Sequence, residues 1–434
     1  MKNVRLAALL VAGGLCSSTS ASAQAPAPAE PPPSNTPPPA PAQPATTPAA
    51  DEGNFFRFYG MFNVRVVAST SAVESFGQPN AVAITAAGNP VLSVAPDKAR
   101  YSFQVAQSRV GFWLNEKGPL RAQLELDFVD VTKATPTVAS LPRLRIARVD
   151  YSFAPGHMLS LGQDWDLHAP LNPHGINLVG ALFESGNAGF MRQQLKYLYS
   201  TPELELGAAV GFPSPNNTAK EAALEIGTLP TLAVRGAYKF GKSRVGASAI
   251  ATRLPFNLGE PTERISTAFS TALFSELSPS ADTQVRVELN FGQNTANLGL
   301  NTLAQGRLSD DMREVGGYIS ARQALTSQHA VYGLAGYQKV LDAAKVLPNY
   351  GYGTPPADGT PPAFSSATLV SNGPGLVHNG TVRLGYEFKP TPKLAFVMEG
   401  FLVQSRFSLL QVDQGRTGPV RSALGLEAGA VLNF

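Results

Sequence analysis

Alternation of apolar and polar residues with a period of two is the feature that most constrains how this chain can fold. From Phe56 to Val66 the even positions are apolar or small, whereas the odd positions include Arg57, Asn63 and Arg65. Because successive side chains of a strand point to opposite faces, such a segment presents one apolar and one polar face. The same alternation recurs in 120–130, 285–292 and 381–388. The pattern predicts an all-β chain and by itself fits both a sandwich and a barrel.

The lengths of the connections favour the barrel. Tight turns such as 115–119 and 201–202 alternate with long connections such as 69–100 and 342–376. Short turns on one side and long loops on the other are typical of outer-membrane barrels. The expected fold is a transmembrane antiparallel up-and-down β-barrel of about 16 strands, and an even number places both termini on the periplasmic side. The expected strands are 55–68, 101–114, 120–130, 143–153, 158–164, 190–200, 203–211, 231–240, 243–253, 264–276, 282–292, 312–323, 329–341, 377–388, 394–406 and 421–434.

The first residues indicate export. Lys2 and Arg5 precede an apolar stretch at 6–15, and the tripeptide Ala-Ser-Ala at 21–23 supplies a small-x-small cleavage site. This arrangement is that of a secretory signal peptide. The apolar stretch is too short for a spanning helix, which needs about 20 residues. We expect cleavage after Ala23.

Cysteine usage and charge exclude several classes of function. The single cysteine, Cys16, lies inside the signal peptide, and lipid attachment there is disfavoured because the preceding Leu15 is bulky. The mature chain then has no thiol, which excludes disulfides, thiol catalysis and cysteine-ligated metals. The 34 basic and 31 acidic side chains nearly balance and point to no nucleic acid. Charged residues make up 15% of the chain, below the roughly 25% of soluble proteins. No segment after residue 16 is a continuous apolar run of spanning length, so the exported protein is either periplasmic or a barrel.

Residues 24–53 form a segment rich in proline and alanine. Proline triplets at 31–33 and 37–39 favour extended polyproline II conformations and offer no apolar face to bury. We expect a disordered periplasmic linker, and a specific role such as threading toward peptidoglycan is the alternative. The chain thus divides into a signal peptide (1–23), a linker (24–53) and a barrel domain (54–434).

The last segment carries the sharpest alternation and ends on an aromatic residue. Leu424, Leu426, Leu432 and Phe434 share one face with two alanines. A terminal aromatic on such a strand resembles the signal read by the barrel-assembly machinery of the outer membrane. We expect Phe434 to face lipid, the strands near 55 and 421 to pair antiparallel, and the proline-rich segment to hang below that seam. The small outward residues of this strand would suit subunit contact, and we expect a homotrimer.

Arginine recurs on the polar faces of the expected strands. In a barrel of this size the interior is wide enough for water, and rings of arginine favour anions. The alternative is that these arginines brace the wall by pairing with Glu125, Asp127, Asp150, Glu288 and Glu387. As a set they should still leave a net positive stripe. The expected pore-lining residues are Arg57, Arg65, Arg109, Arg121, Arg192, Arg235, Arg286 and Arg383, with Arg244 and Arg322 on the same face.

The segment 163–190 is the expected constriction loop. It is long, yet apolar residues such as Leu167 and Ile176 interrupt it. A loop folded into the lumen would pack such residues on the wall, whereas an ordinary external loop with a packed patch is the alternative. Its acids would face wall arginines across a gap and create a transverse field. The residues expected at the constriction are Gln163, Asp164, Trp165, Asp166 and Glu184.

Three runs of sequence resemble the trimeric DcaP-like porins. They are RVGFWLNEKGPLRAQLELDF (109–128), ARVDYSF (147–153) and LSLGQDWDLH (159–168). The resemblance implies a sixteen-stranded trimer with an arginine-rich constriction that passes small anionic solutes, including dicarboxylates. By motif it carries over to Gly162, Gln163 and Trp165, with Arg109 and Arg121 as lining residues. The coiled-coil-prone extension of that family is not expected here, because the N-terminal segment is rich in proline.

The most favoured function is passive diffusion of small hydrophilic solutes through an outer-membrane porin, with mild preference for anions such as carboxylates. One alternative is a structural barrel that tethers the envelope and has a plugged lumen. Another is a barrel enzyme, such as a lipid hydrolase, built on His168, His174 and Ser185. The sequence contains no Gly-x-Ser-x-Gly, His-Glu-x-x-His or phosphate-cradling glycine motif. We therefore expect no catalytic residue, no metal and no cofactor.

Overall fold

The computed structural model describes the barrel strands and part of their connections. The described residues are 55–71, 73, 82, 99–128, 142–168, 171–176, 182–189, 191–212, 230–256, 264–300, 311–342, 376–408 and 417–434. They belong to one compact unit, Gly53–Phe434. The expected signal peptide and linker, and most of the long connections, lie outside the described residues. The part of the chain that is described contains no helix long and apolar enough to cross a membrane.

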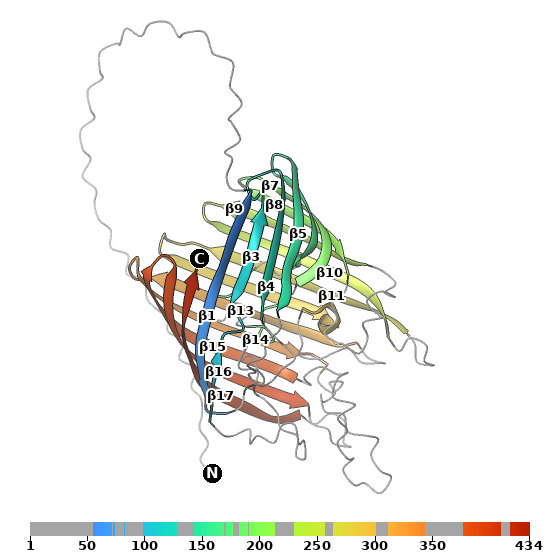
Figure 1. The fold of residues 1–434 in the computed structure, drawn as a ribbon. Coiled ribbons are helices and arrows are strands. Elements are labelled where there is room, and N and C mark those ends of the chain that lie inside the picture. The colour runs from blue at the N-terminus through green and yellow to red at the C-terminus, as the bar shows by residue number, and fades with distance from the viewer. Residues whose placement is uncertain are drawn as a thin grey trace, which may run out of the picture. The chain divides into compact units, whose positions relative to one another are not determined.

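Seventeen strand segments form one antiparallel sheet that closes on itself. From β3 to β17 each segment pairs with its neighbour in the chain, β1 pairs with both β2 and β3, and the last segment pairs with the first. Figure 1 shows β1 in blue beside β17 in red. A short 3-10 helix, η3 (Thr295–Leu298), follows β12. The strands are β1 (Phe56–Ser69), β2 (Arg100–Gln104), β3 (Arg109–Leu114), β4 (Leu120–Asp127), β5 (Arg143–Ala154), β6 (His157–Trp165), β7 (Met191–Ser200), β8 (Leu204–Gly211), β9 (Thr231–Phe240), β10 (Ser243–Phe256), β11 (Arg264–Leu277), β12 (Thr283–Gln293), β13 (Arg313–Ala324), β14 (His329–Val340), β15 (Leu376–Thr391), β16 (Leu394–Ser408) and β17 (Thr417–Asn433).

β2 and β3 are two halves of one barrel strand. Both pair with β1, where Gln104 lies opposite Arg65 and Arg109 lies opposite Met61. One extra residue therefore separates the two halves, as in a β-bulge. Counted as one, they reduce seventeen segments to sixteen strands, and the predicted closed sixteen-stranded barrel is confirmed. The bulge also reverses which parity faces inward, because Gln104 and Arg109 both point to the interior side of the wall.

The two faces of the barrel have the expected polarity. Outward residues such as Leu384 and Leu424 are exposed on the sheet surface, whereas the interior side carries Asn63, Asp150 and Glu288, all fully buried. Along β17 the alternation predicted from the sequence is present, because Leu426 is exposed and its neighbour Glu427 is buried. The polar interior residues are covered because other parts of the chain enter the lumen.

The closing seam fixes the place of Phe434. Its backbone N–H donates to the carbonyl of Gly60 at 3.1 Å, beside the antiparallel β1–β17 pairing. The Phe434 ring lies on the outer face, with ring centroids 6.3 Å from Phe58 and 5.4 Å from Phe62. Gly60 leaves room for this ring, since a Cβ there would overlap it. The predicted antiparallel seam and the outward orientation of Phe434 are therefore both present.

Candidate functional site

The described part of the connection between β6 and β7 lies inside the barrel, and we call these residues, 166–168, 171–176 and 182–189, the inner segment. Its first part is bonded to both sides of the β1–β17 seam. The backbone N–H of Ile176 donates to Glu399 on β16 at 3.3 Å, and Asn63 on β1 donates to the carbonyl of Ile176 at 3.4 Å. Further round the wall, His174 lies 2.8 Å from the hydroxyl of Ser320 on β13. Apolar residues of this part pack in a buried cluster with wall residues; the cluster contains Leu171, Ile176, Leu182, Phe274, Tyr318, Tyr332 and Leu334.

The second part of the inner segment is bonded to strands β12 to β15. The hydroxyl of Ser185 lies 2.9 Å from that of Thr381, and Asn290 donates to the carbonyl of Gly186 at 2.8 Å. Gly186 has φ +97° and lies against the backbone of Gly317, so that a Cβ would overlap the wall. The segment therefore crosses the lumen and is held by hydrogen bonds at several strands.

Under this crossing, the wall contains a closed network of charges. Arg383 donates to Glu399 at 2.8 Å and to Glu427 at 2.9 Å, and Arg65 donates to Glu427 at 2.5 Å. Tyr332 adds a hydrogen bond to Glu399 at 2.8 Å. The four charged side chains are at most 1% exposed. Two positive and two negative groups balance, so this network braces the wall and contributes little field to the lumen.

Most of the other predicted arginines also pair with acids of the wall. Arg192 is 2% exposed and donates to the carbonyl of Leu298 at 2.6 Å and to Asp166 at 3.5 Å. Arg57, near the start of β1, is exposed and pairs with Glu116 in the tight turn between β3 and β4. Most of these arginines thus brace the wall by pairing with acidic residues, as the alternative interpretation expected. The remaining contacts are Arg121 with Asp150 at 3.2 Å, Arg235 with Glu205 at 2.7 Å, Arg286 with Glu276 at 2.9 Å, Arg322 with Glu387 at 2.6 Å, and Arg109 opposite Asp127 in the β3–β4 pairing.

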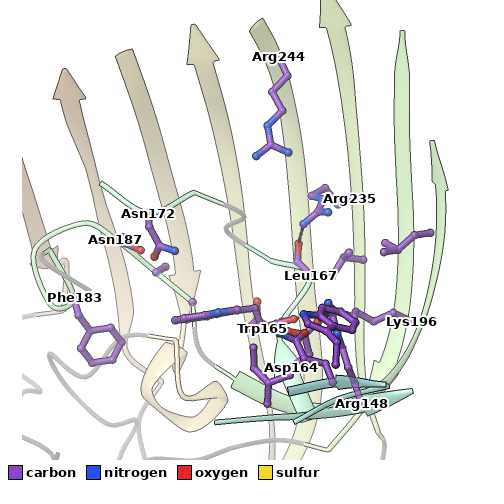
Figure 2. Close-up of a pocket in the computed structure, with 17 residues that line it drawn as sticks. Arg148, Asp164, Trp165, Leu167, Asn172, Phe183, Asn187, Lys196, Arg235 and Arg244 are labelled. Carbon is purple, nitrogen blue, oxygen red and sulfur yellow. Dashed lines mark hydrogen bonds and ion pairs between the residues drawn. The ribbon is translucent and has the colours of Figure 1, made fainter. Parts of the chain in front are cut away.

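A cavity of about 460 Å³ lies beside the inner segment. Figure 2 shows Trp165 between Phe183 and the wall residues Asp164 and Lys196, with Arg235 and Arg244 extending from neighbouring strands. The lining residues of the cavity come from strands β3 to β7, β9 and β10 and from the inner segment. Its charged lining residues are Arg148, Lys196, Arg235 and Arg244, with Asp164 and Asp166.

The five residues predicted at the constriction do not lie together, but are spread over the wall, the cavity lining and the inner segment. Asp164 lies on the wall, where Arg148 and Lys196 both reach it at 2.5 Å. It is therefore neutralised by its own side of the barrel and does not face arginines across a gap. Gln163 has the outward parity of β6 and donates to the carbonyl of Leu144 at 2.7 Å. Trp165 lines the cavity. Asp166 pairs with Arg192, and Glu184 has φ +67° within the inner segment.

Sequence reasoning missed several cavity residues, among them Trp113, Arg148 and Lys196. Arg148 and Lys196 share the inward faces of their strands with Asp150 and Arg192, and Trp113 shares the face of Arg109. Alternation could have placed all three inward. The predicted set contained Trp165 and several arginines of the polar faces but left out Arg148, Lys196 and Trp113.

The two histidines of the inner segment are neutral at pH 7. Burial and the nearby Arg286 lower the pKa of His174 to about 4. Burial, with Arg192 nearby, lowers the pKa of His168 to about 3. His168 lies 3.1 Å from the hydroxyl of Ser248, whereas Ser185 is bonded to Thr381 and to Asn379. Within the described ranges, no three His, Cys, Asp or Glu side chains are grouped to hold a metal ion.

Solved structures share this fold. The DcaP outer-membrane channel of Acinetobacter baumannii has a TM-score of 0.62 at 13% identity, over 87% of this chain and 97% of that one. An anion-selective porin from Comamonas acidovorans has a TM-score of 0.51 at 11% identity, over 87% and 99%. OprB of Pseudomonas putida has a TM-score of 0.50 at 11% identity, over 87% and 94%. No family model and no curated protein matches the sequence. The chain has the outer-membrane porin fold.

Proposed function

We propose that this protein is an outer-membrane porin through which small hydrophilic solutes diffuse passively, with a mild preference for anions. The observation that carries the proposal is the cavity beside the inner segment, which is lined by four cationic and two acidic side chains. Fixed positive charge along a water-filled path attracts anions and repels cations. One solved structure with this fold is described as an anion-selective porin.

The proposed preference for anions depends on fewer arginines than the sequence alternation predicts for the pore lining. Arg65 and Arg383 balance two glutamates, so they add no net charge to the path. The cavity-lining Arg235 and Arg244, by contrast, form a row with Arg286, and the three arginines share two carboxylates, Glu205 and Glu276. This alternating row has one more positive than negative group. It supports a modest anion preference.

Export, assembly and trimerisation belong to the same proposal. The N-terminal leader would direct export, and the β17 strand ending at Phe434 would engage the barrel-assembly machinery. Small outward residues flank an exposed leucine near the seam, because Ala68 pairs with Leu426 on one side and Gly400 pairs with Leu426 on the other. An apolar outer surface with small residues of this kind supports contact between copies in a homotrimer.

Liposome swelling tests this function. Vesicles that contain the folded protein should swell in isosmotic solutions of small sugars and faster in solutions of small carboxylates. Empty vesicles, and vesicles with heat-denatured protein, are the controls. Vesicles that do not swell with any solute would contradict the porin proposal, and swelling at equal rates with cations and anions would contradict only the preference.

A plugged barrel that tethers the envelope is the second candidate, because the inner segment is bonded to strands on several sides of the lumen. Deletion of residues 24–50 separates the two candidates. Loss of envelope integrity with unchanged solute uptake would favour tethering.

A further inference from the structure

Both tryptophans of the chain line the same cavity. The sequence contains two, and Trp113 on β3 and Trp165 at the end of β6 both contribute to its lining. Tryptophan in outer-membrane barrels is ordinarily found in the girdles of the outer face, at the membrane interfaces. Here neither ring is in that position. Phe183 of the inner segment adds a third aromatic ring to the lining.

Arginines hold the two indole rings in place. The guanidinium of Arg148 lies 5.5 Å from the Trp113 ring centre, and that of Arg145 lies 5.1 Å from the Trp165 ring centre. These guanidinium groups are themselves fixed, because Arg148 pairs with Asp164 and Arg145 pairs with Glu125. Contacts between a cation and an aromatic face orient the ring. The cavity therefore offers rigid aromatic surfaces.

A positive region lies on the same cavity. Arg235 and Arg244 share the carboxylate of Glu205, at 2.7 and 3.4 Å. Arg235 is also fixed by a hydrogen bond to the carbonyl of Leu167, at 3.2 Å, and this carbonyl belongs to the inner segment. Figure 2 shows both guanidinium groups above Leu167, with Trp165 below Leu167 in the lining of the same cavity. A carboxylate that enters this space can accept hydrogen bonds from either arginine.

We propose that this cavity binds aromatic carboxylates, with the ring stacked against Trp165 or Trp113 and the carboxylate on Arg235 and Arg244. The volume of about 460 Å³ accommodates a single substituted ring, and sites for small ligands combine an apolar lining with a few placed polar groups in this way. The inference rests on the proposed function, since it names a solute class for the same path. A planar ring gains offset stacking on indole that a saturated ring of similar size does not.

Benzoate and cyclohexanecarboxylate test the proposal, because they carry the same charge and have similar size. Intrinsic fluorescence of the folded protein in detergent reports on the site directly, since both fluorescent indoles lie there. Benzoate should change the emission with saturation, at an affinity about fivefold higher than that of cyclohexanecarboxylate. Trp165→Leu should reduce this ratio toward one, whereas Arg235→Gln should weaken both acids alike. Tyr238→Leu, an aromatic substitution on the outer face of the same strand as Arg235, is the matched control and should leave the ratio unchanged.

Equal affinity for the two acids in the wild-type protein would overturn the aromatic site. An unchanged ratio in both Trp165→Leu and Trp113→Leu would overturn it as well. Because the fluorescence titration measures binding and needs no passage of solute through the barrel, it tests the aromatic site even if the lumen is closed. Failure of the porin proposal is detected separately by the absence of solute flux through vesicles.

Discussion

Arg383 is the residue on which the buried charge network depends most. Its substitution by Met leaves Glu399 and Glu427, both fully buried, without the guanidinium that bridges them. Removal of one partner from a buried ion network costs about 3–5 kcal/mol, whereas an exposed pair is worth about 0–1 kcal/mol. We expect Arg383→Met to lower the thermal unfolding midpoint in detergent clearly, and Arg57→Gln, which breaks an exposed pair, to leave it nearly unchanged. Equal midpoints for the two variants would contradict the bracing role.

His174 makes the attachment of the inner segment sensitive to acid. Its pKa of about 4 in the folded protein lies below the roughly 6.5 of an unfolded chain. The folded state therefore binds fewer protons, and the stabilisation is fully present above pH 6.5 and is lost as the pH falls through 4. Amide hydrogen exchange of residues 171–176 should accelerate between pH 7 and pH 4, after correction for intrinsic rates. His174→Asn should remove most of this dependence; a variant with the same pH profile as the wild type would refute the assignment.

Residue orientation was more predictable than residue pairing. Alternation placed Arg65 and Glu427 on inward faces, but the two are 362 positions apart and meet only because the barrel closes. Asp164 likewise lies next to Lys196 through strand pairing that no local pattern encodes. The sequence therefore indicated an arginine-rich interior and could not tell bracing cations from those that line the cavity.

The inner segment, at the scale of an element, depends on glycine where it touches the wall. Gly186 has φ +97° and no space for a Cβ, whereas Gly241, in a tight turn, has φ +59° and open space around it. Gly186→Ala should displace the segment and increase single-channel conductance, because the backbone of Gly317 cannot move aside. Gly241→Ala introduces similar backbone strain without the overlap, and its conductance should match that of the wild type. Equal conductance for both variants would contradict the packing described for Gly186.

Most strands could be predicted from the sequence, to within a few residues, because one lipid-facing side forces strict alternation. The bulge between β2 and β3 was missed for a physical reason. Each half alternates correctly by itself, and only the pairing with β1 reveals the extra residue. The long connections at 131–141 and 343–375 lie outside the described residues, so their predicted lengths remain predictions.

Closure of the barrel, a property of the whole molecule, depends on the last residue. Phe434 packs against Phe58 and Phe62 on the outer face and shares backbone hydrogen bonds with Gly60. Phe434→Ser removes this aromatic contact and the terminal signal proposed for assembly. We expect a lower yield of heat-modifiable, folded barrel in outer-membrane fractions. Leu204→Ser, an outward change away from the seam, should have a smaller effect, and equal yields for the two variants would contradict this role.

The proposed porin function requires that the interior of the barrel is a water-filled path with a positive cavity wall. The reversal potential of the purified protein in a planar bilayer under a potassium chloride gradient measures this most directly. We expect stepwise conductance with a reversal potential that favours chloride, and a shift of this potential toward zero in the double variant Arg235→Gln, Arg244→Gln. A bilayer without steps, or a potential that favours potassium and does not respond to the double substitution, would contradict it.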